Sequence, residues 1–586
     1  MIKLLRFMKG SYGFAIAAPL FMLLEVIMDL MQPTLMSNIV DVGIAQGDLP
    51  YIWATGGRML LMAFIGVVGG LGCVACSAQA AVSFSSRLRQ AVFNQIQGFS
   101  FVELDRFKTA SLITRLTGDV TQIQSIVLMG LRIMVRSPLI CIGGVVMAYW
   151  LSPRLSLILM IGLPFMLLMA AYFIWKTMPL FLAMQIKMDR VNAVMRENLL
   201  GIKVIKSFVG QKKEQQRFGK ANQELMDRSV QAMQIMTVLF PLVNLVMNLS
   251  VVAVLWFGGR MVVSGGLEIG KIMAFINYLI QIMSSLMMVV MMSISLTRSQ
   301  VSAERLNEVL ETETSIRDMD TAPSLWAEDN ETTRSKGSAI EFRDVSFKHH
   351  NSGEWVLKHI DLKILPGQTI GIIGTTGSGK STLVSLIPRL YEATRGQVLV
   401  DGMDVREIPL KALRGHIGMV LQESILFSGT IEDNLRFSKE TATAAELKEA
   451  AEAAEAWNFI EDKTDGLNAE VAQRGRNFSG GQKQRLSIAR TLLRKPRILI
   501  LDDATSAVDM LTEAKIREAI RQRMGQCTLL LIAQRIAAIK DADKILVMDE
   551  GCVTGFGTHR ELLKTNEIYR HIAVSQLGEE VLADVG

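Results

Sequence analysis

The chain has 586 residues, half of them hydrophobic and 20% charged, and its mean hydropathy is +0.31. This length exceeds one compact core, and this hydropathy indicates that part of the chain lies in a membrane. The net charge is only +6 and the Lys and Arg residues form no continuous stripe, which argues against nucleic acid as a partner.

The first half, residues 1–310, contains six apolar stretches that are long enough to cross a bilayer as helices. Long polar stretches at 81–131 and 176–234 follow the second and the fourth of them. Both stretches are basic and carry helical periodicity, so we expect spanning helices that continue far into the cytoplasm, with the N-terminus on that side. The expected spans lie near 12–36, 56–80, 132–151, 155–175, 235–258 and 272–296.

The first span carries two carboxylates, Glu25 and Asp29, which lie four residues apart and so on one helix face. Ionisable side chains at this depth are costly and suggest a function. Two interpretations stay open: recognition of a cationic amphiphile, or structural pairing with Arg58, Arg132 or Arg136. The many methionines of the sixth span are equally open, because methionine suits both an adaptable cavity and ordinary packing.

After the sixth span, the stretch 311–337 is rich in Glu, Thr, Asp and Ser and lacks apolar periodicity, so we expect a linker. Residues 338–586 follow a different pattern, in which short apolar strands alternate with helical stretches. This alternation predicts an α/β domain. The expected strands include Thr369–Ile373, Ile417–Leu421 and Ile498–Leu501.

The first of these strands leads into the sequence G-x-x-x-x-G-K-S and then into a helical pattern. In this setting the glycines let backbone N–H groups surround phosphates, and the helix N-terminus adds positive potential. Lys380 is expected to reach the β- and γ-phosphates of ATP, and Ser381 to ligate Mg²⁺. The residues of this predicted phosphate loop are Gly374, Thr375, Thr376, Gly377, Ser378, Gly379, Lys380, Ser381 and Thr382.

The strand that ends at Leu501 delivers two further carboxylates, Asp502 and Asp503. Phosphate-loop enzymes hold Mg²⁺ with a carboxylate at the end of such a strand, and we assign that role to Asp502. Asp503 takes the position of a residue that would polarise the attacking water. The alternative use of such a pair is to cap the following helix.

Between these motifs lies a sequence that resembles the signature of ABC ATPases, with Phe478 in place of the usual first leucine. The order of the motifs agrees, since Gln422 resembles the Q-loop glutamine and Ser506–Asp509 resembles the D-loop. The resemblance extends over nearly the whole chain and is to export-type ABC half-transporters. Its signature residues are Ser479, Gly480, Gly481 and Gln482.

This resemblance implies that ATP is held between two cassettes, with the phosphate loop of one facing the signature of the other. A second ABC half-transporter is therefore the expected partner. The resemblance also implies Mg²⁺ ligation by Ser381, Gln422 and Asp502, and transmission of movement through coupling helices. Our candidates for those helices are Thr114–Ile123 and Gly201–Phe208.

Three positions depart from the family pattern, and two of them concern hydrolysis. Asp503 replaces a glutamate and is shorter by about 1.5 Å, and a displacement of that order costs about 10²-fold in a positioned reaction. Gln534 replaces the switch histidine and cannot carry a proton. His349 replaces the aromatic residue that stacks on adenine. With Gln422, the first two are the expected catalytic residues.

These departures predict a site that binds Mg·ATP but hydrolyses it poorly, while the intact signature completes a competent site on the partner. The expected function is that of one subunit of a heterodimeric exporter of hydrophobic or amphipathic compounds in a bacterial inner membrane, in contact with its lipid. The alternatives are a homodimeric lipid or peptide exporter, an importer on the exporter fold, and an ATP-binding regulatory subunit.

Overall fold

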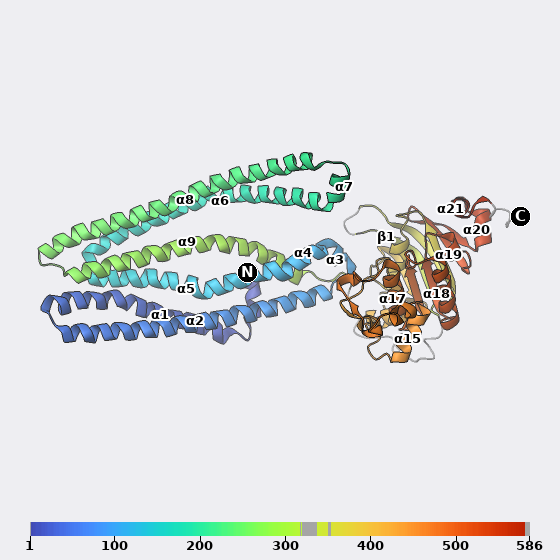
Figure 1. Cartoon of the computed structure of the whole chain (residues 1–586), viewed down its shortest axis with the longest axis horizontal. Coiled ribbons are helices and arrows are strands. Elements are labelled where there is room, and N and C mark those ends of the chain that lie inside the picture. The colour runs from blue at the N-terminus through green and yellow to red at the C-terminus, as the bar shows by residue number, and fades with distance from the viewer. Residues whose placement is uncertain (1, 317, 319–336, 350–352, 580–586) are drawn as a thin grey trace. The chain divides into compact units, whose positions relative to one another are not determined.

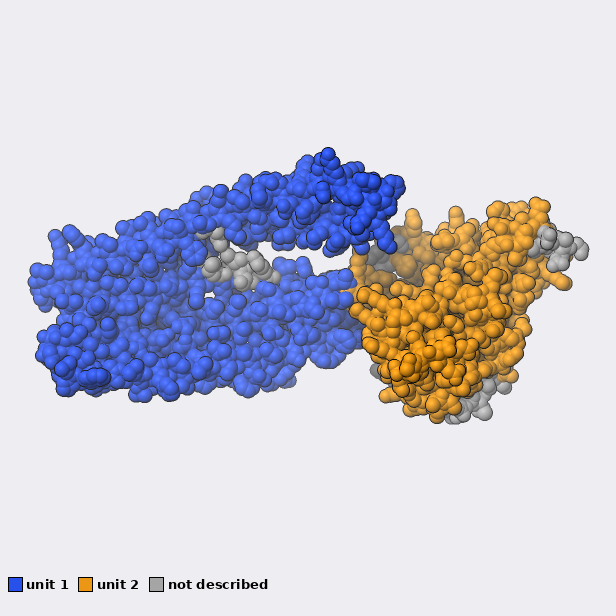
Figure 2. Space-filling view, in the orientation of Figure 1, with its two compact units in different colours: residues 1–97, 110–312 blue, residues 98–109, 313–586 orange. Residues whose placement is uncertain are grey.

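The residues that the computed structural model describes are 2–316, 318, 337–349 and 353–579. The chain divides into two compact units, which Figure 2 colours separately. Unit 1 comprises Met1–Gln97 and Ala110–Thr312, and unit 2 comprises Gly98–Thr109 and Glu313–Gly586. Most of the linker expected at 311–337 lies outside the described residues.

The described residues of unit 1 form helices and short turns (Figure 1). Six stretches of the described chain are long and apolar enough to cross a membrane, which confirms the expected membrane fold: Tyr12–Ile44, Leu49–Gln97, Thr109–Leu151, Pro153–Leu200, Gln211–Val263 and Ile269–Val289. The helices are η1 (Ile2–Met8), α1 (Tyr12–Asn38), η2 (Ile39–Ile44), α2 (Leu49–Gln97), α4 (Thr109–Thr114), η3 (Arg115–Asp119), α5 (Val120–Leu151), α6 (Pro153–Leu200), α7 (Ile202–Ser207), α8 (Gln211–Val263) and α9 (Ile269–Glu311).

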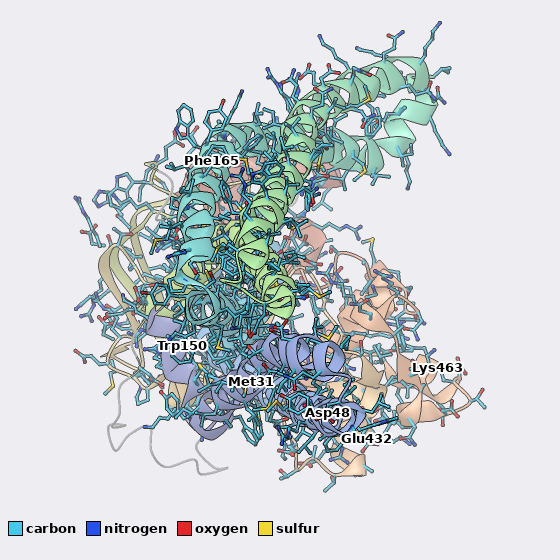
Figure 3. All side chains as sticks on the ribbon, turned by 90° about the vertical axis from the view of Figure 1, so that its left-hand side faces the viewer. Met31, Asp48, Trp150, Phe165, Glu432 and Lys463 are labelled. Atoms are coloured by element: carbon cyan, nitrogen blue, oxygen red, sulfur yellow. The ribbon has the colours of Figure 1, made fainter. Side chains whose placement is uncertain are left out.

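Large apolar side chains project from the outer surface of these helices. Trp150 is 75% exposed and Phe165 is 57% exposed, and both stand at the periphery of the bundle in Figure 3. Between them, Ser152 ends α5 and caps α6 by accepting a hydrogen bond from the backbone N–H of Leu155 at 3.4 Å, with Pro153 at the first position of the helix. An apolar outer surface of this kind suits contact with lipid.

The first long polar stretch contains the short helix α3 (Phe101–Phe107), which belongs to unit 2 although its neighbours in the sequence belong to unit 1. Our first candidate coupling segment, Thr114–Ile123, lies in unit 1 and runs from the end of α4 across η3 to the start of α5, and its coupling role stays a prediction. The second candidate, Gly201–Phe208, does contain a short helix, α7, at the turn between α6 and α8 (Figure 1).

Helix α3 is fixed within unit 2 by a buried carboxylate. Glu103, only 5% exposed, accepts hydrogen bonds from the backbone N–H of Ser100 at 2.8 Å and of Ser315 at 3.1 Å, and from both serine hydroxyls. Burial raises the pKa of Glu103, but these hydrogen bonds together outweigh it and hold the pKa below its usual value. Tyr391 adds a hydrogen bond to Asp105 at 2.8 Å.

Unit 2 is an α/β domain, as expected. Its strands are β1 (Ile340–Phe347), β2 (Leu357–Ile364), β3 (Thr369–Gly374), β4 (Arg395–Val400), β5 (Met403–Asp404), β6 (Ile417–Val420), β7 (Gly429–Thr430), β8 (Glu470–Val471), β9 (Ile498–Asp502), β10 (Thr528–Ile532), β11 (Lys544–Asp549) and β12 (Cys552–Gly557). Besides α3, its helices are α12 (Lys380–Leu386), α13 (Leu410–His416), α14 (Ile431–Arg436), α15 (Ala444–Ala453), α16 (Trp457–Glu461), η4 (Gly466–Asn468), η5 (Gln473–Gly475), α17 (Gly480–Leu492), α18 (Met510–Arg523), α19 (Ile536–Ile539), α20 (His559–Thr565) and α21 (Glu567–Leu577).

The main sheet has the strand order β12-β11-β3-β10-β9-β6, in which all strands but β12 are parallel. A second, antiparallel sheet has the order β2-β1-β4-β5. In the parallel sheet, Ile532 of β10 is in register with Ile372 of β3 and with Asp502 of β9. The carboxyl ends of these three strands therefore meet at one edge, where open α/β sheets bind their ligands.

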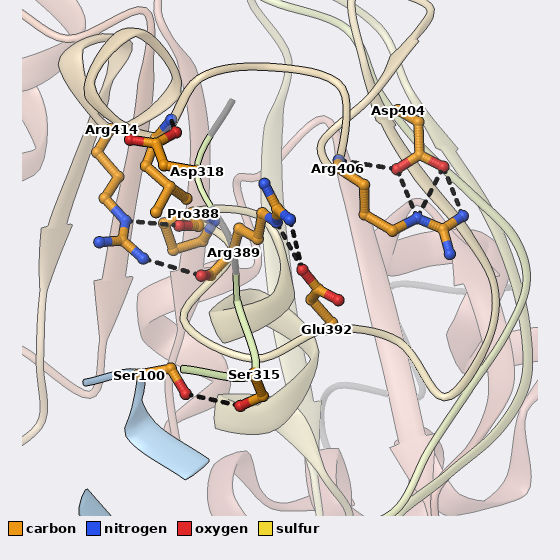
Figure 4. A network of polar contacts seen from close by, with 10 residues as sticks. Ser100, Ser315, Asp318, Pro388, Arg389, Glu392, Asp404, Arg406 and Arg414 are labelled. Atoms are coloured by element: carbon orange, nitrogen blue, oxygen red, sulfur yellow. Dashed lines mark hydrogen bonds and ion pairs between the residues drawn. The ribbon is translucent and has the colours of Figure 1, made fainter. Parts of the chain in front are cut away.

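A polar network holds the loop that carries Tyr391 (Figure 4). Arg389 is buried and donates to Glu392 at 2.8 Å. Arg414 donates to the backbone carbonyls of Pro388 at 3.0 Å and Arg389 at 2.9 Å. This network supports the loop from which Tyr391 contacts Asp105 and Phe101 of α3.

We predict that Glu103→Ala loosens α3, because the charge-assisted hydrogen bonds from Ser100 and Ser315 to this buried carboxylate are lost at a cost of about 2 kcal/mol. Hydrogen exchange of 98–109 should become faster in the variant. Glu407→Ala, which removes an exposed carboxylate of the same unit, is the control and should leave this exchange unchanged. Equal exchange in the two variants would contradict the role of Glu103.

Candidate ATP-binding site

The predicted phosphate loop follows β3 and ends where α12 begins, so its residues form one continuous turn. Gly377 and Gly379 have φ values of 85° and 92°, which side chains rarely adopt. A Cβ atom at Gly379 would lie 2.8 Å from the side chain of Leu357 and 3.0 Å from the carbonyl oxygen of Val356. The tight loop that exposes backbone N–H groups to phosphates therefore depends on glycine.

Lys380 bends back over this loop. Its ammonium donates to the carbonyl oxygens of Gly374 at 2.9 Å and Thr375 at 2.7 Å, and to the hydroxyl of Ser378 at 3.4 Å. Burial lowers the pKa of Lys380, an effect that the nearby Asp502 and Asp503 oppose. A positive charge is thus held inside the loop, where the phosphates of a nucleotide would lie.

The strand-end carboxylate Asp502 lies against the start of α12, where its Oδ1 accepts a hydrogen bond from the hydroxyl of Ser381 at 3.0 Å. Burial raises the pKa of Asp502, and this hydrogen bond opposes the change. No group of three or more His, Cys, Asp and Glu residues that could hold a metal occurs in the described chain. Mg²⁺ typically takes one or two carboxylates together with waters and phosphate oxygens, so this hydroxyl–carboxylate pair fits it.

The second carboxylate, Asp503, is 9% exposed and lies at the centre of a cluster with the other two predicted catalytic residues. Its Oδ2 accepts a hydrogen bond from the amide of Gln534 at 2.8 Å and a longer one from Gln422 at 3.5 Å. Burial raises the pKa of Asp503, and both amides lower it. The third proposed Mg²⁺ ligand, Gln422, thus directs its amide nitrogen to Asp503.

The backbone around Asp503 is constrained as well. Its φ is 49°, in the left-handed region, and its N–H donates to the carbonyl oxygen of Ile532 at 3.1 Å. On the far side of Gln534, its carbonyl oxygen accepts a hydrogen bond from the amide of Gln576 at 2.7 Å. The contact between Asp503 and Gln534 is therefore held from both sides.

The signature residues form the N-terminus of α17. Ser479 and Gln482 make a reciprocal capping box, in which the N–H of Gln482 donates to Ser479 at 3.3 Å and the N–H of Ser479 donates to Gln482 at 3.0 Å. Gln484 accepts the N–H of Ala507 at 2.9 Å and donates to Ser506 at 3.2 Å, which ties α17 to the predicted D-loop. A Cβ at Gly481 would lie 2.8 Å from the carbonyl oxygen of Ala507.

The signature and the phosphate loop stay apart within this chain. Among the described residues, no hydrogen bond or ion pair joins Ser479–Gln482 to 374–382. His349, the predicted adenine-stacking residue, packs edge-on against Phe347 and Tyr391, with ring centroids 5.0 and 5.4 Å away. Sequence reasoning did not single out Tyr391, which contacts both His349 and α3.

Comparison with known proteins agrees with this geometry. The model of the ABC transporter transmembrane region matches residues 15–287, and the ABC transporter model matches residues 357–506. The uncharacterised ABC transporter ATP-binding protein YfiB of Bacillus subtilis is 40% identical, over 99% of both chains. The chain belongs to the ABC transporter family. It is a multi-pass membrane protein and an ABC-type ATPase coupled to transport.

Other relatives carry more specific names. The putative multidrug export ATP-binding/permease protein YgaD of Bacillus subtilis is 34% identical over 83% of both chains. The ATP-dependent lipid A-core flippase of Syntrophus aciditrophicus is 31% identical over 84% of this chain and 81% of its own. The structure of a bacterial Atm1-family ABC exporter with ATP bound has the same fold, with a TM-score of 0.81 at 24% identity, over 97% of this chain and 99% of that one.

We predict that Gln534→Leu destabilises unit 2 in a pH-dependent way. The folded-state pKa of Asp503 is already raised, so its contribution to stability is greatest at low pH and is lost as pH rises through that pKa. Loss of the Gln534 donor raises this pKa further and costs about 1 to 2 kcal/mol at neutral pH. At neutral pH, the variant should unfold at a lower temperature than the unmodified chain. This difference in unfolding temperature should become smaller as pH falls.

The matched control for this prediction is the same substitution in an Asp503→Asn background, where no carboxylate needs the donor. There the effect of Gln534→Leu should be smaller and independent of pH. A deficit of equal size in both backgrounds would mean that Gln534 acts by packing alone.

Proposed function

We propose that this chain is the subunit of a heterodimeric ABC exporter that binds Mg·ATP at a weakly hydrolytic site and lends its signature to a competent site on its partner. The observation that carries the proposal is the hydrogen bond from Gln534 to Asp503. The residue placed to polarise water is a short carboxylate, and its neighbour is an amide that cannot take up a proton. The supports for binding, Lys380 and the Ser381–Asp502 pair, are complete.

In this proposal Asp502, Ser381 and Gln422 hold Mg²⁺, which would neutralise charge on the phosphates of ATP. The signature residues Ser479–Gln482 are preorganised by their own capping box and make no described hydrogen bond to the chain's own phosphate loop, which supports their use by a second cassette. His349 would pack against adenine less extensively than a larger aromatic residue. The second cassette would supply the catalytic glutamate and the switch histidine.

We further propose that the substrates are hydrophobic or amphipathic compounds and that transport is outward. The names of two relatives, a multidrug exporter and a lipid A-core flippase, support this class. The bacterial sources of the relatives and the basic polar stretches support a bacterial inner membrane with unit 2 in the cytoplasm. A homodimeric lipid exporter is the second candidate, because the flippase relative favours a lipid substrate.

We predict that the purified chain alone binds ATP but turns it over slowly, and that Asp503→Glu combined with Gln534→His raises its ATP turnover by about 10- to 100-fold. The phosphate loop, Asp502 and Gln422 match the family pattern. A longer carboxylate at 503 and a side chain at 534 that can take up a proton should therefore restore ATP hydrolysis. Steady-state phosphate release measures the effect. Adding Lys380→Ala to this double variant is the control and should abolish the gain.

Brisk turnover by the unmodified chain alone would contradict this prediction. So would a double variant that binds ATP normally but gains no turnover, because the defect would then lie outside Asp503 and Gln534.

A further prediction concerns the complex with the partner. Ser479→Arg places a bulky charge on the signature and should lower total ATP hydrolysis by at least about tenfold, because it damages the competent site. Lys380→Ala, which removes phosphate binding at the chain's own site, should lower hydrolysis less. Hydrolysis that falls more in Lys380→Ala than in Ser479→Arg would assign the competent site to this chain.

A further inference from the structure

The C-terminal helix α21 contacts the loop that carries Gln534. The last turn of this helix holds Gln576, whose side-chain amide makes two hydrogen bonds to the loop. The amide nitrogen donates to the carbonyl oxygen of Gln534 at 2.7 Å, and the amide oxygen accepts the N–H of Ile536 at 2.8 Å. Both partners are backbone groups, so Gln576 fixes the path of the loop rather than a single side chain.

The loop presents these two groups together because of the residue between them. Arg535 is extended, with φ of −103° and ψ of 128°, and in extended backbone the carbonyl before a residue and the N–H after it point to the same side. Arg535 stands at the N-cap of α19, and its side chain makes no capping hydrogen bond in the described chain. Gln576 therefore supplies an acceptor that the start of α19 otherwise lacks.

The other end of α21 is anchored in unit 2. Asn566 accepts the N–H of Tyr569 at 2.8 Å and donates to the carbonyl oxygen of Thr554 in β12 at 3.0 Å. Tyr569 is fully buried, and its hydroxyl is hydrogen-bonded to the ring of His559 at 2.6 Å. The helix is thus fixed at its first turn and reaches the loop with its last turn.

These contacts connect α21 with the carboxylate of Asp503. The amide nitrogen of Gln534 donates to Asp503 at 2.8 Å, and the backbone of Gln534 is the part that Gln576 holds. A glutamine side chain loses much of its rotamer freedom when its amide stays on one acceptor. Because the fixed backbone keeps the amide of Gln534 within reach of Asp503, loss of Gln576 should let this donor leave the carboxylate.

We propose that Gln576 is a positioning residue of the ATP site and that, through it, α21 determines how strongly the site prefers ATP to ADP. This inference rests on the proposed function in one respect, which is the place of Asp503 beside the γ-phosphate. A carboxylate repels that phosphate unless a donor offsets its charge, and Gln534 is such a donor at 2.8 Å. Without Gln576, Asp503 would face the γ-phosphate of ATP with less compensation, whereas ADP has no phosphate at that place.

The test measures equilibrium binding of radiolabelled Mg·ATP and Mg·ADP to the purified full chain in nanodiscs, on ice, where turnover is slow. Gln576→Leu should weaken ATP binding by about 3- to 10-fold, because a hydrogen bond to a charged group is lost, and should leave ADP binding unchanged. Ser575→Ala changes an exposed neighbour on the same helix and is the matched control. It should alter neither affinity.

A second variant keeps one of the two hydrogen bonds. Gln576→Glu retains the length of the side chain and an oxygen that can accept the N–H of Ile536, but it removes the donor to the carbonyl of Gln534. It should keep α21 on the loop and still weaken the binding of ATP but not of ADP. The test therefore stands even where Gln576→Leu does not fold.

A double variant shows through which residue Gln576 acts. Once Gln534→Leu has removed the donor to Asp503, adding Gln576→Leu should cause no further loss of ATP affinity. An equal loss of ATP and ADP binding in Gln576→Leu would mean that α21 only stabilises unit 2, and it would overturn the proposal. So would unchanged ATP binding, or losses that add in full in the double variant.

Failure of this inference and failure of the proposed function give different results, because binding is measured without hydrolysis. Brisk turnover by the unmodified chain, together with a loss of ATP binding alone in Gln576→Leu, would refute only the weakly hydrolytic site. Slow turnover, together with ATP and ADP affinities that Gln576→Leu changes equally, would refute only the role of Gln576.

Discussion

The hydrogen bond between the amide of Gln534 and the carboxylate of Asp503 is the interaction on which this account of the chain depends. It occupies an oxygen of the residue placed to polarise water, and it does so with a group that cannot accept a proton. Around it the binding apparatus is complete, from the glycine-dependent loop to the Ser381–Asp502 pair. In our proposal, the chain therefore binds ATP well at this site but cleaves it slowly.

Much of this could be predicted from the sequence because the signals are local. The phosphate loop is a contiguous motif, and each span is identified by its own apolar length. The contact between Asp503 and Gln534 is not local, because it requires β9 and β10 to be neighbours in the sheet, and strand order is not written in either segment. The start of α3 at Phe101 carries a local signal that the sequence analysis did not use, the capping box of Ser100 and Glu103.

In the membrane half, too, the pairing of charged side chains depends on how the helices pack. The sequence indicated that Glu25 and Asp29 share a helix face, and it left three arginines as partners. Only packing decides among them, since α1 and α5 bring Arg136 to both carboxylates. One guanidinium that bridges two carboxylates ties α1 to α5 within the bundle.

The most direct test of the central claim follows the γ-phosphate at each site of the native complex. Membranes would be loaded with photoreactive azido-ATP that carries its radiolabel on the γ-phosphate, allowed to turn over, and then irradiated. The account predicts that this chain keeps the γ-label after the label has disappeared from the partner, because its phosphate loop with Lys380 holds uncleaved nucleotide. Loss of the γ-label from this chain as fast as from the partner would show that Asp503 and Gln534 support hydrolysis, and it would contradict the account.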